Sequence, residues 1–209
     1  MLFKNRIQAG KQLAKKLSAY RNKKDVIVLG IPMGGVEVAF AVAKLLHVEL
    51  NIIVTKKIGH PFNPELAIGA VSPDNYIIDE DYKDKEGYAK KAIKELNAEI
   101  KKRYKKYAQG KLPQLKNKIV IVVDDGLATG YTMLAAIKYV KSKSPKKVIV
   151  AVPVAAHDSY EKVKLLADEV VCLHVPIFFS AVGSFYHEFE QLDDEDVISL
   201  IKEAKAAQK

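Results

Sequence analysis

Five short apolar runs, each of strand length and rich in β-branched residues, constrain the fold of this chain most strongly. Their sequences are VIVL (26–29), LNIIVT (50–55), KIVIVV (118–123), KVIVAVPV (147–154) and EVVCLHV (169–175). Uninterrupted apolar runs of this length are typical of strands that are covered on both faces of a sheet. We therefore expect each of the five to be a fully buried strand.

Amphipathic helical patterns separate most of these runs. They cover residues 36–47, 131–143 and 159–168, and a further helix is expected over residues 5–20. Apolar strands that alternate with such helices predict an α/β fold in which helices cover both faces of a parallel sheet. A last helix is expected from Leu192 onward, because the acidic residues that follow suit the positive end of a helix dipole.

The pattern changes between the second and third runs. Residues 66–71 (LAIGAV) and 75–79 (NYIID) flank a good turn sequence and predict a small hairpin flap beside the main sheet. Residues 57–65 contain two prolines, a glycine and an asparagine, so we expect a loop there. We expect one domain over residues 1–209, with a flap and basic helical insertion over 72–118 and a C-terminal appendage and helix over 176–209.

The net charge of +9 comes from one segment. Residues 83–118 contain 13 basic and 4 acidic residues, and the rest of the chain contains 21 of each sign. An apolar residue recurs there every four positions, which predicts a long helix with a basic outer face. That face could attract nucleic acid or polyphosphate, or be a solvated surface of the kind found in thermophiles. We favour the solvated surface and expect no nucleic-acid partner, because aromatic residues do not interleave with the lysines. The apolar stripe is Tyr88, Ala92, Leu96, Ile100 and Tyr104.

Composition excludes several classes of protein. Cys172 is the single cysteine, which excludes a disulfide framework and a cysteine-based zinc site, and we expect an inert core thiol. No apolar run reaches the roughly 18 residues of a membrane span, and the first residues, MLFKNRIQAGKQ, lack the apolar region of an export signal. We expect a soluble, cytoplasmic protein with no membrane partner.

The turn after the third apolar run has the residues of a ligand site. In an open parallel sheet, ligands bind beyond the carboxyl ends of the strands. In VIVVDDGLATGYT (120–132), Asp124 and Asp125 end a strand and can bind a vicinal diol or a hard cation. The following ATGYT offers backbone N–H groups and hydroxyls to a phosphate at a helix start. A ribose phosphate fits both halves. The alternative is a plain turn in which Asp125 and Thr129 cap the helix.

This thirteen-residue segment resembles the signature of the type I phosphoribosyltransferases, which bind 5-phosphoribosyl 1-pyrophosphate (PRPP). The resemblance implies that Asp124 and Asp125 contact the ribose hydroxyls and hold Mg²⁺, directly or indirectly. Where this chain has Gly126, the family usually has a branched apolar residue. The family's 5-phosphate loop corresponds here to Ala128, Thr129, Gly130, Tyr131 and Thr132.

A second motif extends the resemblance. VLGIPMGG (28–35) matches the family's pyrophosphate loop, which implies that backbone N–H groups of Met33, Gly34 and Gly35 face the diphosphate. Close relatives often have arginine at the position of Met33, so we expect Lys56 and Lys57 to supply positive charge. The resemblance covers nearly the whole chain, from FKNRIQAG to VGSFYHEF, and points to a subgroup of unassigned substrate.

The resemblance implies transfer of the phosphoribosyl group of PRPP to a nitrogen acceptor, expected to be a nucleobase, with release of pyrophosphate by a homo-oligomer such as a dimer. Members specific for 6-oxopurines have an aspartate where this chain has Ala128, which argues against that substrate class. Glu65 and His60, in the segment 55–74 that matches the family's flexible lid, are possible substitutes for the missing base.

The acceptor is expected to contact two regions, the loop after the fourth strand and the C-terminal appendage, which corresponds to the family's variable hood. Their aromatic rings could stack on a planar base, or could simply pack the hood onto the sheet. A PRPP- or nucleotide-binding regulator without catalysis, contacting RNA through the basic helix, is the alternative function. The candidate acceptor residues are His157, Phe178, Phe179, Phe185 and Tyr186.

Overall fold

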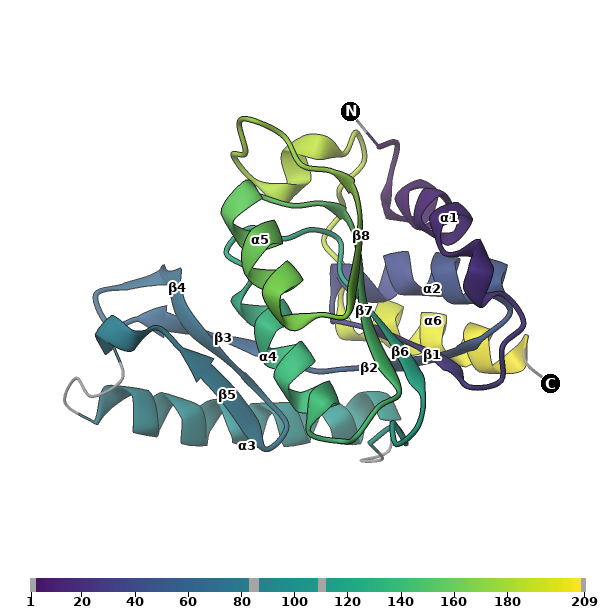
Figure 1. Cartoon of the computed structure of the whole chain (residues 1–209). Coiled ribbons are helices and arrows are strands. Elements are labelled where there is room, and N and C mark those ends of the chain that lie inside the picture. Colours follow the sequence, from purple (N-terminus) through teal and green to yellow (C-terminus); the bar gives the residue numbers. More distant parts are fainter. Residues whose placement is uncertain (1–2, 83–86, 109–111, 208–209) are drawn as a thin grey trace.

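The computed structural model describes residues 3–82, 87–108 and 112–207, and its centre is a five-stranded parallel sheet (Figure 1). The strand order is β2-β1-β6-β7-β8, and every neighbouring pair is parallel, as the sequence predicts. The strands are β1 (Val26–Gly30), β2 (Glu49–Ile52), β6 (Ile119–Val123), β7 (Lys147–Val154) and β8 (Glu169–His174).

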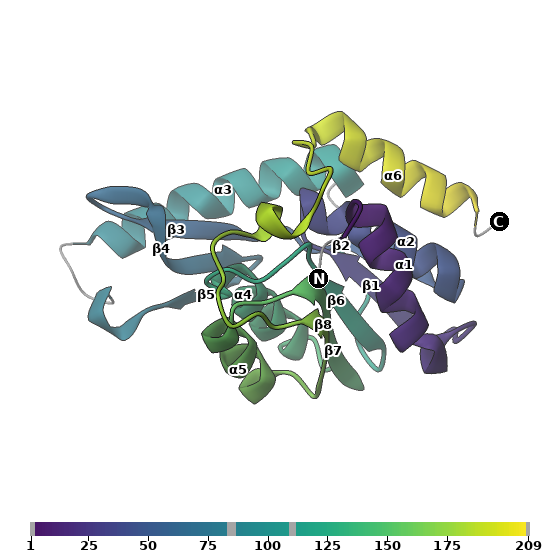
Figure 2. The same ribbon diagram turned by 90° about the horizontal axis from the view of Figure 1, so that it is seen from above.

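Helices cover both faces of this sheet, which confirms the predicted α/β fold. Figure 2 shows α1 (Arg6–Lys16), α2 (Gly34–Leu46) and α6 (Asp194–Ala206) on one side, with α4 (Tyr131–Lys141) and α5 (His157–Leu166) on the other. Side chains alternate along each strand between the two cores, so that Val28 and Ile121 face α2 while Leu29 and Val122 face α4. Asp193 caps α6 and forms a capping box with Asp196.

The two edge strands are less buried than expected. Every residue of β8 is half-buried, and Glu49 of β2 is exposed, because an edge strand has a neighbour on one side only. Cys172 in β8 is therefore half-buried rather than part of the deep core, although burial still raises the pKa of its thiol to about 11. A thiol with that pKa stays protonated and unreactive at neutral pH.

The flap is larger than expected, and the prediction of a loop over residues 57–65 is wrong. The flap is an antiparallel sheet of β3 (Lys56–His60), β4 (Asn63–Ser72) and β5 (Asn75–Ile78), in that order. The two prolines are accommodated because Pro61 lies in the turn and Pro64 lies where the β3–β4 pairing is irregular. The predicted hairpin turn is confirmed, since Ser72 pairs with Asn75.

The long helix α3 (Tyr88–Ala108) runs along the flap and reaches α6 (Figure 1). Its predicted apolar stripe packs against the flap, and the Tyr104 hydroxyl accepts a 3.1 Å hydrogen bond from Val54 N. Lys106 pairs with Asp194 and Glu195 of α6. Residues 83–86 and 109–111 of the predicted basic segment lie outside the described residues. Within the described residues, no helix combines the length and apolar character needed to cross a membrane.

Candidate active site

The two predicted ligand-binding turns are neighbours because β1 and β6 are adjacent parallel strands. Gly30 and Val123 are paired at the carboxyl ends of the two strands, and Ile31 N donates a 2.9 Å hydrogen bond to Val123 O. The turn of residues 31–33 and the turn of residues 124–130 therefore start side by side. This edge of the sheet is where ligands bind in open α/β folds.

Two glycines allow the turns to touch. A Cβ at Gly34 would overlap Asp125 Oδ2, and a Cβ at Gly35 would lie 2.7 Å from Asp124 Oδ1. The paired glycines of the first turn thus leave room for the acidic pair of the second. The peptide bond that precedes them, between Pro32 and Met33, is cis.

Burial disfavours negative charge on the acidic pair. It raises the pKa of the Asp124 carboxyl well above its usual range, and the neighbouring Asp125 carboxylate raises it further. Burial also raises the pKa of Asp125, although the Arg6 guanidinium works in the opposite direction. Arg6 Nε donates a 2.8 Å hydrogen bond to Asp125 Oδ2. Glu37, half-buried beside Arg6, likewise has a pKa raised by burial.

The predicted phosphate loop ends in a helix start that no side chain caps. Gly130 adopts a φ of +77°, in the left-handed region that favours glycine, and α4 begins at the next residue. Its first backbone N–H groups are therefore available to an anion. Ser159 of α5 stabilises the loop, since its hydroxyl donates a 2.5 Å hydrogen bond to Ala128 O.

Two of the loop's side chains have different surroundings. Thr129 is exposed at the turn, whereas the Tyr131 hydroxyl donates a 2.8 Å hydrogen bond to Asp79 Oδ2 beside the flap. Burial and this bond raise the pKa of Tyr131 to about 12. The Tyr131 side chain therefore joins the loop to the flap, and the phosphate contact expected at this position is left to its backbone N–H.

The substitution of glycine for a branched residue at position 126 has a structural counterpart. A Cβ at Gly126 would lie 2.6 Å from Val182 Cγ1, in the short 3₁₀ helix η3 (Val182–Phe185) of the hood. Val182 therefore occupies the space that a branched side chain at position 126 would need. The absence of a side chain at Gly126 therefore allows the hood to pack against this turn.

The lysines expected at the diphosphate lie beyond the end of β2, the strand next to β1. Lys56 Nζ forms a 2.9 Å ion pair with Glu99 of α3, so its charge is shared with that helix. Lys57 follows it in β3. The preceding Thr55 is 6% exposed, and its Oγ1 has no hydrogen-bond partner among the described residues. A buried hydroxyl without a partner is costly unless a ligand or water completes it.

A cavity of about 430 Å³ opens beside the predicted phosphate loop. The loop contributes Thr129, α5 contributes His157 and Lys162, and the segment after β8 contributes Ile177 and Phe179. The cavity therefore joins the predicted phosphate loop to two of the predicted acceptor residues. Its volume is in the range of small-molecule sites.

The other aromatic candidates lie in different surroundings. Phe178 is 90% exposed, and Phe185 stacks on Phe179 with ring centroids 5.5 Å apart. Tyr186 packs against Phe3 and Phe189, with ring centroids 5.4 Å and 5.1 Å apart, and it is only 6% exposed, so little of its ring is available to a base. For Tyr186 the structure supports the alternative of packing the hood. Its hydroxyl donates a 2.6 Å hydrogen bond to Asp125 O.

The two candidate bases belong to the flap. The His60 ring contacts Tyr82 edge-on at 5.2 Å, and its Nδ1 accepts a 3.2 Å hydrogen bond from Phe62 N. Glu65 lies in β4. The segment 55–74 that matches the family's flexible lid is thus a paired β structure here.

Sequence reasoning gave no role to Arg6. It lies in the FKNRIQAG segment, and the structure places it directly on the acidic pair. The available signal was its residue type, because Arg6, Arg21 and Arg103 are the only arginines in a chain of 34 basic residues.

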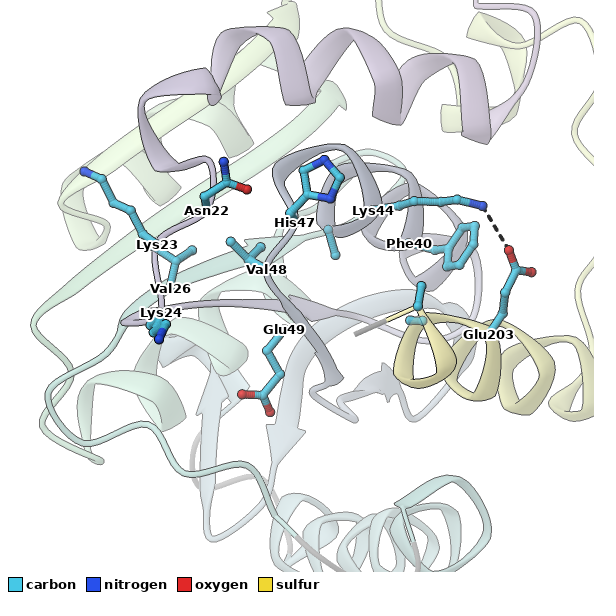
Figure 3. A pocket seen from close by; sticks show the side chains of 13 residues that line it. Asn22, Lys23, Lys24, Val26, Phe40, Lys44, His47, Val48, Glu49 and Glu203 are labelled. Carbon is cyan, nitrogen blue, oxygen red and sulfur yellow. Dashed lines mark hydrogen bonds and ion pairs between the residues drawn. The ribbon is translucent and has the colours of Figure 1, made fainter. Parts of the chain in front are cut away.

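A larger cavity, of about 600 Å³, lies at the opposite end of the sheet (Figure 3). Its lining includes Val26, the first residue of β1, whereas the acidic pair lies beyond the last residues of β1 and β6. Its floor is apolar at Phe40, and Lys44 and Glu203 pair across its rim at 3.0 Å. None of its described polar side chains is buried, so it lacks the fixed polar groups of the site at the other end.

The chain is similar to known proteins in sequence and in fold. Residues 2–190 match the family model described as "Phosphoribosyl transferase domain". The chain is similar to "Putative phosphoribosyl transferase Rv0571c" of Mycobacterium tuberculosis, at 39% identity over 97% of this chain and 47% of that protein. It thus spans about half the length of the curated relatives that it matches. A uracil phosphoribosyltransferase of Mycoplasma genitalium is 38% identical over 42% of this chain and 38% of that protein.

Among solved structures, the crystal structure of TT1426 from Thermus thermophilus is similar over 97% of this chain and 99% of that one. The identity is 38% and the TM-score is 0.83. This similarity extends over the main sheet, the flap and the hood together.

Proposed function

Because the chain belongs to the phosphoribosyltransferase family and has the type I fold, we propose that it transfers the 5-phosphoribosyl group of PRPP to a nitrogen of a small acceptor and releases pyrophosphate. In this reaction the bond between ribose C1 and the diphosphate oxygen breaks, a C1–nitrogen bond forms, and the acceptor nitrogen loses its proton. The observation that carries the proposal is that an acidic pair and two glycine-containing turns meet at one sheet edge.

Each part of the site suits one part of PRPP. The carboxylates of Asp124 and Asp125 would accept hydrogen bonds from the ribose hydroxyls, and the uncapped start of α4 would bind the 5-phosphate. The backbone at Gly34 and Gly35, with Lys56 and Lys57, would bind the diphosphate. Holding all three parts fixes C1 near the acceptor, and such positioning is a large part of catalysis in a displacement of this kind.

The two carboxylates suit a Mg²⁺ ion that binds together with the substrate. Within the described residues, no group of three or more His, Cys, Asp or Glu side chains is placed to hold a metal. Mg²⁺ commonly binds through one or two carboxylates together with substrate phosphates and water. We assign Asp124 this role, with Asp125 acting through water because its Oδ2 is bound by Arg6. When bound, the ion would neutralise charge on the departing diphosphate.

We propose the cavity beside the phosphate loop as the acceptor site. Phe179 offers a ring for stacking on a planar base, and His157, whose side chain is 73% exposed, offers a group that can take up a proton. Ala128 supplies no carboxylate in the phosphate loop, which favours an acceptor other than a 6-oxopurine.

Thermal unfolding tests the ligand assignment without knowledge of the acceptor. A ligand at a hundredfold excess over its Kd stabilises a folded protein by about 2.7 kcal/mol. We therefore expect PRPP with Mg²⁺ to raise the Tm by roughly 5–11 °C, at about 2–4 °C per kcal/mol for a domain of this size. Ribose 5-phosphate, which lacks the diphosphate, should give a smaller rise. NAD serves as the control and should give none, and the absence of a shift with millimolar PRPP would refute the proposal.

Turnover separates the enzyme from a PRPP-binding regulator. Incubation with PRPP, Mg²⁺ and a panel of nucleobases should release pyrophosphate with at least one base. PRPP binding without pyrophosphate release on any base would favour the regulator, whose ligand site would be the same.

The basic face of α3 provides a further prediction. Lys101, Lys102 and Lys105 are exposed, whereas Lys106 is ion-paired with α6. We expect Lys→Gln changes at the three exposed positions to leave PRPP binding unchanged in calorimetry. Any nucleic-acid binding should be weak and should disappear by about 200 mM salt. Tight RNA binding at physiological salt that is lost in this triple variant would instead support the regulator.

A further inference from the structure

Arg6 is a buried cation whose hydrogen bonds run to widely separated parts of the chain. It is the first residue of α1, and it is 6% exposed, whereas Arg21 is exposed. Nε donates to Asp125 Oδ2 at 2.8 Å, and a terminal nitrogen donates to Glu190 O at 2.8 Å. The same terminal nitrogen lies 3.7 Å from Glu37 Oε2.

The plane of the guanidinium is fixed as well. Its Cζ lies 3.8 Å from the centroid of the Phe189 ring, in the hood. Stacking on a ring combined with directed N–H bonds leaves a guanidinium one orientation, which a lysine ammonium could not reproduce. Arg6 is thus a rigid partner for the Asp125 carboxylate.

The backbone of Asp125 is held by a second buried residue. Tyr186 is 6% exposed, and its hydroxyl donates to Asp125 O at 2.6 Å. Phe3 and Phe189 both pack against the Tyr186 ring. The side chain and the main chain of Asp125 are therefore each bound by a residue outside the thirteen-residue motif.

We propose that Arg6 and Tyr186 are positioning residues that fix Asp125 for the ribose of PRPP. Arg6 binds Oδ2 and leaves Oδ1 to accept from a ribose hydroxyl, while Tyr186 fixes the peptide from which the carboxylate projects. A carboxylate that is already oriented loses less conformational freedom when the sugar binds. This inference rests on the proposed function, because it concerns the ribose subsite of the same site.

The test compares three ligands by calorimetry: PRPP with Mg²⁺, ribose 5-phosphate, and pyrophosphate with Mg²⁺. The first two carry the ribose diol and the third does not. We expect Arg6→Gln to lower the affinity for PRPP and for ribose 5-phosphate by about tenfold or more, since a hydrogen bond to a charged group is lost from the carboxylate. The affinity for pyrophosphate should stay within about twofold of the wild-type value. Tyr186→Phe should show the same selectivity with a smaller loss, and Arg6→Lys should recover part of the ribose 5-phosphate affinity.

Matched controls separate positioning from a general effect on folding. Arg21→Gln removes an exposed arginine, and Tyr20→Phe removes a hydroxyl that binds Glu169 on a different part of the protein. Both should leave all three affinities unchanged. If Arg6→Gln does not fold, Arg6→Lys and Tyr186→Phe still provide the comparison between ribose 5-phosphate and pyrophosphate.

Several outcomes would overturn the inference while the proposed function stands. An equal loss for all three ligands would make Arg6 a purely structural residue, and unchanged ribose 5-phosphate binding would exclude positioning. Tighter ribose 5-phosphate binding in Arg6→Gln would show that the guanidinium competes with the sugar. Failure of the wild type to bind PRPP would instead refute the proposed function itself, and the inference with it.

Discussion

Asp124→Asn is expected to stabilise the free protein and at the same time to weaken its binding of PRPP. Folding buries the Asp124 carboxyl beside Asp125, and both effects raise its pKa. An amide of nearly the same shape removes the unfavourable charge. We therefore expect the free energy of unfolding to rise at pH 7, where the buried carboxylate is most unfavourable. The same change removes a charge-assisted hydrogen bond to the ribose, which lowers PRPP affinity by roughly ten- to a hundredfold.

The stability gain has a defined pH dependence. An acid whose pKa is raised on folding binds more protons in the folded than in the unfolded state, so its contribution to stability falls as the pH rises from the unfolded value, near 3.8, through the folded pKa. The difference in Tm between Asp124→Asn and the wild type should therefore be largest at neutral pH and shrink toward pH 4.

Thermal unfolding over this pH range, together with PRPP titration, measures both effects. Asp81→Asn is the matched control, because Asp81 is exposed near the flap and its substitution should change neither quantity. A destabilised Asp124→Asn protein that still binds PRPP normally would contradict both the electrostatic argument and the ribose assignment.

Gly34→Ala is expected to disrupt the site more severely. The new Cβ would overlap Asp125 Oδ2 and lie 2.7 Å from Arg6 Nε, so the ion pair between these two groups would have to separate. Breaking a buried pair costs about 3–5 kcal/mol. The sequence motif alone predicts that a side chain at Gly34 weakens the binding of PRPP, because it disturbs the diphosphate subsite, and leaves the binding of ribose 5-phosphate unchanged. Because a Cβ at Gly34 would meet the carboxylate that we propose binds the ribose, we expect both ligands to lose about a hundredfold or more in affinity, at about 1.4 kcal/mol for each factor of ten.

A double-mutant cycle isolates the cause. In an Asp125→Ala background the Cβ at position 34 no longer meets a carboxylate, so the added loss of stability from Gly34→Ala should be much smaller than in the wild type. Denaturant unfolding measures the four free energies. Equal losses in the two backgrounds would show that the clash is with Arg6 Nε or with another part of the turn and not with the carboxylate.

The main sheet could be predicted because local pattern determines it. Five apolar runs and the helices between them lead to one parallel sheet, and the structure has all five strands in a sheet covered on both faces. The sequence predicts more burial for the edge strands than they have, since the residues of β8 do not reveal that only β7 lies beside them. Strand order is a tertiary property, and the length of an apolar run does not encode it.

The strand β3 could not be predicted because its stability comes from outside the segment. Ile58 is buried by α3 and β4, while its neighbours in sequence read as a loop rich in proline and glycine. Gly59 allows the backbone of Pro64 to approach, which a Cβ at that position would block at 2.5 Å. Tertiary packing therefore overrides the local signal.

The conformations of the turn before α4 and of the glycine pair could be predicted for a similar reason to the sheet, since each motif is contiguous in sequence. The phosphate-binding role of that turn stays a prediction. The contact between the two motifs follows from the adjacency of β1 and β6. The Arg6 and Tyr186 contacts could not be predicted, because each joins a segment far away in the sequence to the turn after β6, and the sequence does not show which distant segments meet. Their roles as positioning residues, and the roles of the acceptor candidates, stay predictions.

The sequence positions of the residues that bind Arg6 also constrain the order in which contacts can form during folding. Arg6 and Asp125 are separated by 119 positions, and Arg6 and Glu190 by 184. During synthesis, α1 therefore emerges long before the residues that complete its polar contacts. Contacts between residues so far apart in sequence form slowly, because closing the long intervening loop costs entropy. Until they form, the hood does not cover Arg6. We expect ligand-binding capacity to appear as a late event in refolding, after the parallel sheet has acquired its protection against hydrogen exchange.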